Sequence, residues 1–241
     1  MDGTLIGGSS FMLHVRHAVS AIAAGLCSTA LITAGESGRS RVEAKGFPEF
    51  IGGTLAGQFE VPYGGSVPPT MFTIPVLRYL ETHGLKPEDM APVSVVQREW
   101  AALNPRATFK EPITVDDVMN SRMVAYPFTL LMCCLRTDGG GALILTSADR
   151  ARDFPHLPVY ILGTGESAEG PMVSQLADFT SSKAFRLSGK QAFAEANITP
   201  NDVDHLMIYD AFSHVPLYGL EDLGFCKPGE AAGFIKDRHT A

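Results

Sequence analysis

Apolar residues near the start of the chain recur at helical spacing between Ser10 and Gly25. This period predicts a helix with Ser9 or Ser10 as its N-cap and Gly25 as its stop, and the apolar face comprises Phe11, Val15, Ala18, Val19 and Ile22. The next segment, CSTALITAG at residues 27–35, is short, apolar and closed by a glycine, which predicts a buried strand. The two segments together predict half of an α/β unit.

The middle of the chain alternates between polar and periodic segments. Residues 36–65 are rich in glycine and charge and predict an excursion over the surface, whereas residues 69–83 and 87–103 predict two helices that begin near prolines. Thr114 is the expected cap of a short helix within residues 113–121. GALILTS at 141–147 predicts a central strand, and SADRARDF at 147–154 predicts a capped helix.

The last third repeats this alternation. Residues 156–169 predict a strand and the most plausible internal boundary, followed by a helix over 181–197, a strand over 205–212 and a helix over 215–223. Alternating helices and short apolar strands predict an α/β fold in which both sheet faces are covered. We expect a domain of residues 1–154, with a loop insertion at about 36–112, and a second domain of residues 155–241.

Composition narrows the class of protein. The 241 residues are 45% hydrophobic and carry 19 basic and 26 acidic side chains, a net charge of −7, so they offer no electrostatic footprint for nucleic acid. His14, Arg16 and His17 interrupt the first apolar run, which argues against a membrane span. Four cysteines without metal-binding spacing suggest a reducing cytoplasm.

Several short motifs carry candidate chemistry. The turn in TLIGGSSF, residues 4–11, can hold a nucleophile, bind an anion through its amides, or cap the helix. His14 and His17 lie three residues apart on one helix, but with no third ligand in view we expect no metal site. We interpret Cys133 and Cys134 as buried core residues and GTGES, residues 163–167, as a loop.

Four separate stretches resemble the thiolase superfamily, within it the thiolase-like lipid-transfer branch that includes the sterol carrier protein X thiolase and proteins similar to acetyl-CoA acetyltransferase. They are residues 7–37, 133–151, 198–213 and 220–234. The resemblance implies two similar βαβαβαββ halves in a layered α-β-α-β-α arrangement. It also implies that both halves are incomplete here, because Met1 falls inside the family pattern and Ala241 falls before its Gly-rich, histidine-bearing motifs.

The resemblance assigns candidate site residues. The family's nucleophilic cysteine falls at Gly8, or at Gly7 or Ser9 with a slip of one residue, so this sequence departs from the pattern that ordinary cysteine thiolysis requires. We therefore expect Gly7, Gly8, Ser9 and Ser10 to bind substrate through backbone amides. The family motif Asn-Glu-Ala-Phe matches residues 209–212, so Tyr209 and Asp210, with His214 close behind, are the expected catalytic residues.

The resemblance also implies a function. Members of this branch that lack the cysteine resemble retro-aldolases, which cleave a β-hydroxyacyl-CoA and work with a small OB-fold CoA-binding partner. We expect a thiolase-like acyl-CoA enzyme that takes the CoA thioester as its substrate, has no permanently bound cofactor, and forms a homodimer through residues 27–35. The alternative is a non-catalytic acyl-CoA or lipid-binding subunit, or an inactive fragment.

Overall fold

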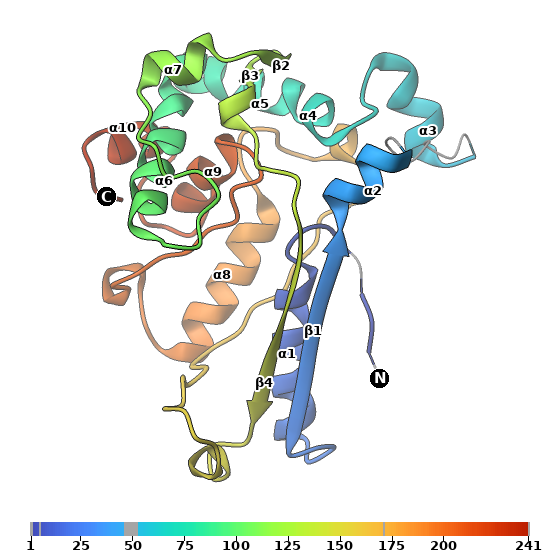
Figure 1. The fold of residues 1–241 in the computed structure, drawn as a ribbon, viewed down its shortest axis with the longest axis vertical. Helices are drawn as coiled ribbons and strands as arrows, with labels where there is room; N and C mark the ends of the chain where they lie inside the picture. Colours follow the sequence, from blue (N-terminus) through green and yellow to red (C-terminus); the bar gives the residue numbers. More distant parts are fainter. Residues whose placement is uncertain (1, 5, 46–52, 171, 241) are drawn as a thin grey trace. The chain divides into compact units, whose positions relative to one another are not determined.

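The computed structural model describes residues 2–4, 6–45, 53–170 and 172–240 (Figure 1). The chain divides into two compact units that are interleaved in sequence. Unit 1 comprises Met1–Pro48, Arg136–Ser167 and Leu187–Thr199, and unit 2 comprises Glu49–Leu135, Ala168–Arg186 and Pro200–Ala241. This division differs from the two similar halves that were expected from the sequence, with a boundary between residues 154 and 155. Those two halves stay a prediction.

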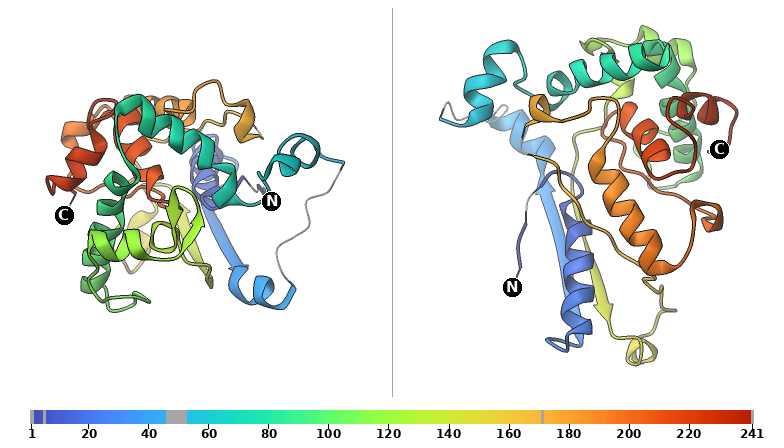
Figure 2. Two further views of the ribbon diagram at one scale, coloured as in Figure 1. Left: turned by 90° about the horizontal axis from the view of Figure 1, so that it is seen from above. Right: turned by 180° about the vertical axis from the view of Figure 1, so that it is seen from behind.

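Unit 1 is built around a long two-stranded ribbon. Strand β1 (Thr29–Ser37) pairs antiparallel with β4 (Asp138–Thr146), from Thr29 opposite Thr146 to Ser37 opposite Asp138. The predicted first helix is confirmed as α1 (Ser10–Ala23), which packs along this ribbon (Figures 1 and 2). The other elements of unit 1 are α2 (Gly38–Lys45), the 3₁₀ turn η4 (Ala151–Asp153) and most of α8 (Lys183–Ala196).

Both ribbon strands were expected to be buried, and this expectation is wrong. The side chains of Leu31 and Ile144 are 66% and 62% exposed, and Ile32 is the only buried residue of β1. The reason is that β1 and β4 have only each other as ladder partners within the described residues. Such a ribbon, with α1 packed along it, leaves most apolar side chains exposed.

The GTGES segment, residues 163–167, is a loop as predicted. Its two glycines are explained by the close approach of the loop to the backbone of α8. A Cβ atom at Gly163 would lie 2.2 Å from the Ala192 carbonyl oxygen, and one at Gly165 would lie 1.8 Å from that of Ser188. Both carbonyls belong to α8, so the two glycines let the loop run directly against the helix backbone.

Unit 2 is mainly helical. Its short strands β2 (Met123–Ala125) and β3 (Phe128–Thr129) form a second two-stranded sheet. Its helices are α3 (Leu55–Phe59), α4 (Pro68–Met71), α5 (Thr73–His83), α6 (Ala91–Leu103), α7 (Val115–Asn120), α9 (His214–Asp222) and α10 (Ala231–Lys236). Its 3₁₀ turns are η1 (Val61–Tyr63), η2 (Pro87–Met90), η3 (Leu130–Met132), η5 (Val173–Gln175) and η6 (Pro200–Asp202).

The main hydrophobic core lies in unit 2, where α5, α6, α9 and α10 pack together with the β2–β3 segment. Its largest fully buried side chains include Tyr79, Phe128, Met90, Met132 and Leu217. Figure 2 shows α6, α9 and α10 grouped in this way. This core fixes the start of α9 and the segment that leads into it.

The predicted helices of unit 2 are confirmed, together with the predicted cap of α7. Thr114 caps α7 as expected: its Oγ1 accepts from the Asp117 amide at 3.1 Å, and the Asp117 carboxylate accepts from the Thr114 amide at 2.8 Å. The helix predicted over residues 69–83 corresponds to α4 followed by α5. The helix predicted over residues 87–103 corresponds to η2 followed by α6.

Four further expectations, all about secondary structure, differ from the structure. Residues 36–65 contain α2 and α3 rather than only a surface excursion, while residues 46–52 lie outside the described ones. The expected helix at 147–154 is a turn ending in η4. The expected strands at 156–169 and 205–212 do not form, except for one bridge between Phe212 and Cys133. A strand requires a neighbour's backbone groups, and these two segments have no such ladder among the described residues.

No helix within the described ranges combines the length and the apolar content needed to cross a bilayer.

Candidate functional site

The Gly7–Ser10 turn leads into α1 in unit 1. Gly7 has a φ of +112°, a conformation that glycine adopts readily and other residues rarely do. The Ser10 hydroxyl accepts from the Ile6 amide at 2.8 Å and donates to the Gly7 carbonyl at 2.6 Å. Ser10 is 9% exposed. Its hydroxyl is thus committed to holding the turn closed, which disfavours a nucleophilic role.

Ser9 occupies the N-cap position of α1, but its side chain makes no capping hydrogen bond. Within the described residues, the amides of Gly8 and Ser9 donate to no protein acceptor. Gly8 and Ser9 are exposed and lie at the start of a 14-residue helix, where the helix dipole favours negative charge. This geometry favours the anion-binding interpretation of the turn over the nucleophile and the side-chain cap.

Tyr209 and Asp210 lie in unit 2, in the irregular segment just before α9. This segment is anchored by the bridge between Phe212 and Cys133 and by a hydrogen bond from the Cys134 amide to the Ala211 carbonyl at 2.9 Å. Both side chains are exposed, Tyr209 to 47%. The two residues are therefore held on a fixed backbone while their functional groups reach solvent.

Partial desolvation raises the pKa of Tyr209, and the neighbouring Cys134 and Asp210 add smaller contributions in the same direction. Its hydroxyl consequently keeps its proton at neutral pH and can act as a hydrogen-bond donor. Desolvation also raises the pKa of the Asp210 carboxyl, against an opposing effect of its backbone hydrogen bond. A carboxylate of raised pKa is a stronger base than an ordinary surface aspartate.

His214 begins α9 and points into the core rather than to solvent. It is 3% exposed, and its ring lies among four aromatic rings with centroid separations of 5.4–5.9 Å, from Phe72, Phe128, Phe212 and Tyr218. Burial lowers the pKa of His214 to about 3. This placement favours a packing role for the neutral ring, and its expected part in catalysis stays a prediction.

Sequence reasoning missed the proximity of Cys134 to Tyr209. Cys133 packs against the core, as expected, but Cys134 is exposed, so the expectation of two buried cysteines is half wrong. Desolvation raises the pKa of the Cys134 thiol, with a further contribution from Asp210. No sequence signal linked Cys134 to Tyr209, because the two residues are 75 positions apart in the chain. The bridge between Cys133 and Phe212 brings their segments together.

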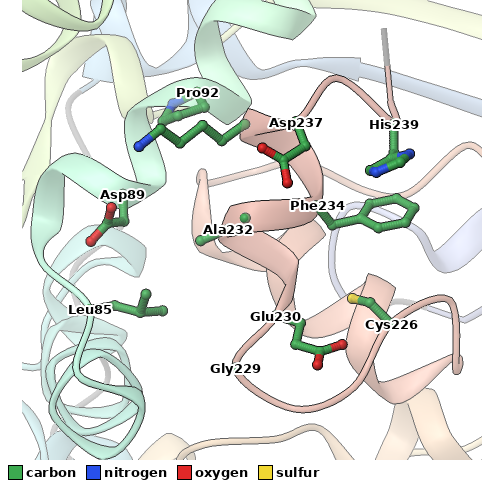
Figure 3. A pocket seen from close by; sticks show the side chains of 12 residues that line it. Leu85, Asp89, Pro92, Cys226, Gly229, Glu230, Ala232, Phe234, Asp237 and His239 are labelled. Atoms are coloured by element: carbon green, nitrogen blue, oxygen red, sulfur yellow. The ribbon is translucent and has the colours of Figure 1, made fainter.

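Unit 2 also contains a cavity of about 540 Å³ beside α10 (Figure 3). None of the expected site residues lines it. Its charged lining comprises Asp89, Glu230 and Asp237 against one cation, Lys236. This acidic balance disfavours the phosphate groups of CoA as occupants.

The model of the Thiolase C-terminal domain-like family matches residues 165–241. A steroid side-chain-cleaving aldolase of Thermomonospora curvata is 38% identical in an alignment of 182 residues that covers 73% of this chain and 46% of that protein. A 17-hydroxy-3-oxo-4-pregnene-20-carboxyl-CoA lyase of Mycobacterium tuberculosis is 34% identical over 96% of this chain and 62% of that protein.

Among solved structures, the Ltp2-ChsH2(DUF35) aldolase matches with a TM-score of 0.86 at 33% identity, over 96% of this chain and 61% of that one. The present chain thus spans about half the length of the first of these relatives and about three fifths of the other two.

Proposed function

This chain belongs to the thiolase superfamily and has a mixed α/β fold with thiolase-like relatives, and on that basis we propose that it cleaves a carbon–carbon bond next to a CoA thioester. The proposed reaction is the retro-aldol cleavage of a β-hydroxyacyl-CoA. The observation that carries the proposal is the pair formed by Tyr209 and Asp210, which offers a donor and a base in a chain that has Gly8 where the family has its cysteine.

The steps follow from the chemistry of the two side chains. The Asp210 carboxylate accepts the proton of the β-hydroxyl, the oxygen's electron pair forms a carbonyl, and the bond between Cα and Cβ breaks. The electron pair of that bond moves into the thioester as an enolate, whose oxygen accepts a hydrogen bond from the Tyr209 hydroxyl. The proton that Asp210 took from the β-hydroxyl is then returned to Cα, which regenerates the carboxylate and gives a shortened acyl-CoA and a ketone or aldehyde, with no acyl-enzyme intermediate.

The raised pKa values of both side chains support these roles. A tyrosine that keeps its proton suits the donor, and a carboxylate of raised basicity suits the base. We propose that the exposed amides of Gly8 and Ser9 also bind the substrate as donors. For His214, which was expected from the sequence to be catalytic, we propose that the buried ring instead holds the start of α9, and with it the segment carrying Tyr209.

The names of the relatives suggest where to look for substrate and partner. A side-chain-cleaving aldolase and a pregnene carboxyl-CoA lyase support a steroid CoA thioester that bears a hydroxyl on the β carbon. The DUF35 component of the related aldolase supports the expected OB-fold CoA-binding partner. We also propose a homodimer that pairs through β1, and a cytoplasmic location in keeping with four free cysteines.

The experiment compares the wild type with Tyr209→Phe and Asp210→Asn, each mixed with an OB-fold partner and a 17-hydroxysteroid-20-carboxyl-CoA. We expect both variants to lose about 10²–10⁴-fold in turnover while keeping the wild-type circular dichroism spectrum. Tyr63→Phe is the matched control, because Tyr63 is an 88% exposed tyrosine of the same unit. Unchanged turnover in Tyr209→Phe refutes the assignment, and substrate binding without turnover in the wild type favours the non-catalytic subunit.

A further inference from the structure

The structure brings a third potential metal ligand to the two histidines of α1. His14 and His17 lie one turn apart, and the Asp2 carboxylate approaches both rings from the segment before the helix. Asp2 Oδ2 lies 2.5 Å from His17 Nδ1 and 3.5 Å from His14 Nδ1. One ligand atom from each of the three residues lies within 4.8 Å of the others. Two imidazoles therefore present the same ring nitrogen to one carboxylate oxygen.

A second carboxylate orients the His17 ring. His17 Nε2 lies 3.3 Å from Glu166 Oε2, so an N–H on this nitrogen faces a carboxylate acceptor. Without metal, Nδ1 forms a hydrogen bond with Asp2 Oδ2, and this nitrogen would bind the ion once the ion displaces its proton. Arg16 helps to position Glu166, since its guanidinium forms ion pairs with Glu166 at 4.0 Å and with Glu195 at 3.0 Å. A carboxylate on the far ring nitrogen is the usual outer-shell partner of a metal-bound histidine.

We propose that Asp2, His14 and His17 form a binding site for one divalent transition-metal ion, with Zn²⁺ as the ion that fits best. Two imidazole nitrogens and one carboxylate oxygen are zinc ligands, whereas Ca²⁺ and Mg²⁺ require oxygen ligands. Three protein ligands leave a fourth tetrahedral position for water or another small ligand. With both histidines neutral, the charges of Asp2, Glu166 and the ion sum to zero.

The distances require a small local adjustment. Ligand atoms in a tetrahedral zinc site lie about 3.4 Å apart, given bonds of about 2.1 Å. The distance from Asp2 Oδ2 to His14 Nδ1, 3.5 Å, already has this value, and the distance from Asp2 Oδ2 to His17 Nδ1, 2.5 Å, must grow by about 0.9 Å. The ligand nitrogens of His14 and His17 lie within 4.8 Å of each other, so their separation must shorten by at most about 1.4 Å. Asp2 has the freedom to make this movement, because its side chain is 56% exposed and lies outside any helix or strand.

The test measures Zn²⁺ binding to the metal-free, untagged chain by isothermal titration calorimetry. We expect one equivalent per chain, with an affinity that falls at least 100-fold in Asp2→Asn, His14→Gln and His17→Gln. Glu166→Gln removes only the outer-shell partner and should cost about 10–100-fold. His156→Gln is the matched control, an exposed histidine of the same unit that should leave binding unchanged.

Two results would overturn the proposal: the absence of saturable Zn²⁺ binding, or an affinity that Asp2→Asn and His14→Gln leave unchanged. In the first case, the cluster is a hydrogen-bonded triad only. If a histidine variant loses helical circular dichroism, Asp2→Asn and Glu166→Gln decide, because neither residue lies in a helix. The measurement uses no acyl-CoA, so its failure is separate from failure of the proposed reaction.

Discussion

Replacement of His214 by phenylalanine should remove an acid-sensitive point from the core of unit 2. The ring is buried, and within the described residues its Nδ1 has no hydrogen-bond partner. Its neighbours are four aromatic rings, which a phenylalanine ring of similar shape can contact equally well. His214→Phe therefore keeps the packing and removes the polar and titratable atoms.

The magnitude follows from the difference between the folded and unfolded pKa values. Burial lowers the pKa of His214 from 6.5 to about 3, so between these pH values the unfolded chain binds a proton that the folded chain does not. Stability is then lost as the pH falls, by about 1.4 kcal/mol per pH unit. The wild type should lose about 3 kcal/mol from this group between pH 7.5 and 4.5, and the variant should lose none. Removing the unpaired Nδ1 should stabilise the variant by a further 1–3 kcal/mol or so at any pH in this range.

The assay is urea unfolding at pH 7.5, 5.5 and 4.5, followed by far-ultraviolet circular dichroism. The measured quantity is the difference in unfolding free energy between His214→Phe and the wild type, because effects of other groups cancel in it. His205→Gln serves as the control for removal of a histidine, since His205 is an exposed histidine of the same unit.

The expected result is a difference that grows in favour of the variant by about 3 kcal/mol from pH 7.5 to pH 4.5. A difference that stays constant over this range would refute the reasoning, because it would mean that His214 titrates alike in the folded and unfolded chains. A variant less stable than the wild type at pH 7.5 would show that the ring nitrogen is paired in solution.

Two further substitutions test the interior and the caps. Tyr79→Phe removes the hydroxyl that donates to Glu221 Oε1 at 2.6 Å, so that among the described residues the Ala231 amide remains as the donor to this oxygen. We expect a loss of about 1.5–3 kcal/mol in urea unfolding, and a loss below the error would refute the role of this bond. Thr114→Ala removes the α7 cap and should cost about 1 kcal/mol by the same measurement, whereas an unchanged midpoint would mean that the cap contributes nothing.

Local signals predicted the helices well because their causes are local. The apolar spacing of α1 and the reciprocal cap of Thr114 with Asp117 involve residues within a few positions of each other. By contrast, Asp138 accepts hydrogen bonds from the amides of Arg39 and Ser40 at the start of α2. That contact spans 98 or more positions, so no local rule could find it.

Local signals predicted the strands less well than the helices. Residues 156–169 and 205–212 have the apolar composition of strands, yet strand formation depends on a partner's backbone groups rather than on composition alone. For the same reason the sequence could not tell whether β1 and β4 would be covered. The ribbon pairing itself joins segments more than 100 positions apart.

The candidate site residues show the same contrast between features set by local sequence and features set by long-range contacts. The sequence by itself determined the chemical inventory: Tyr209 and Asp210 in a family position, glycines at the start of α1, and two histidines one helical turn apart. Only the tertiary structure decided which groups reach solvent and which meet. It buried His214 among aromatic rings, exposed Cys134 near Tyr209, and placed Asp2 and Glu166 against His17. Burial and long-range contact set pKa values and ligand geometry, and these depend on chain segments that lie far apart in the sequence.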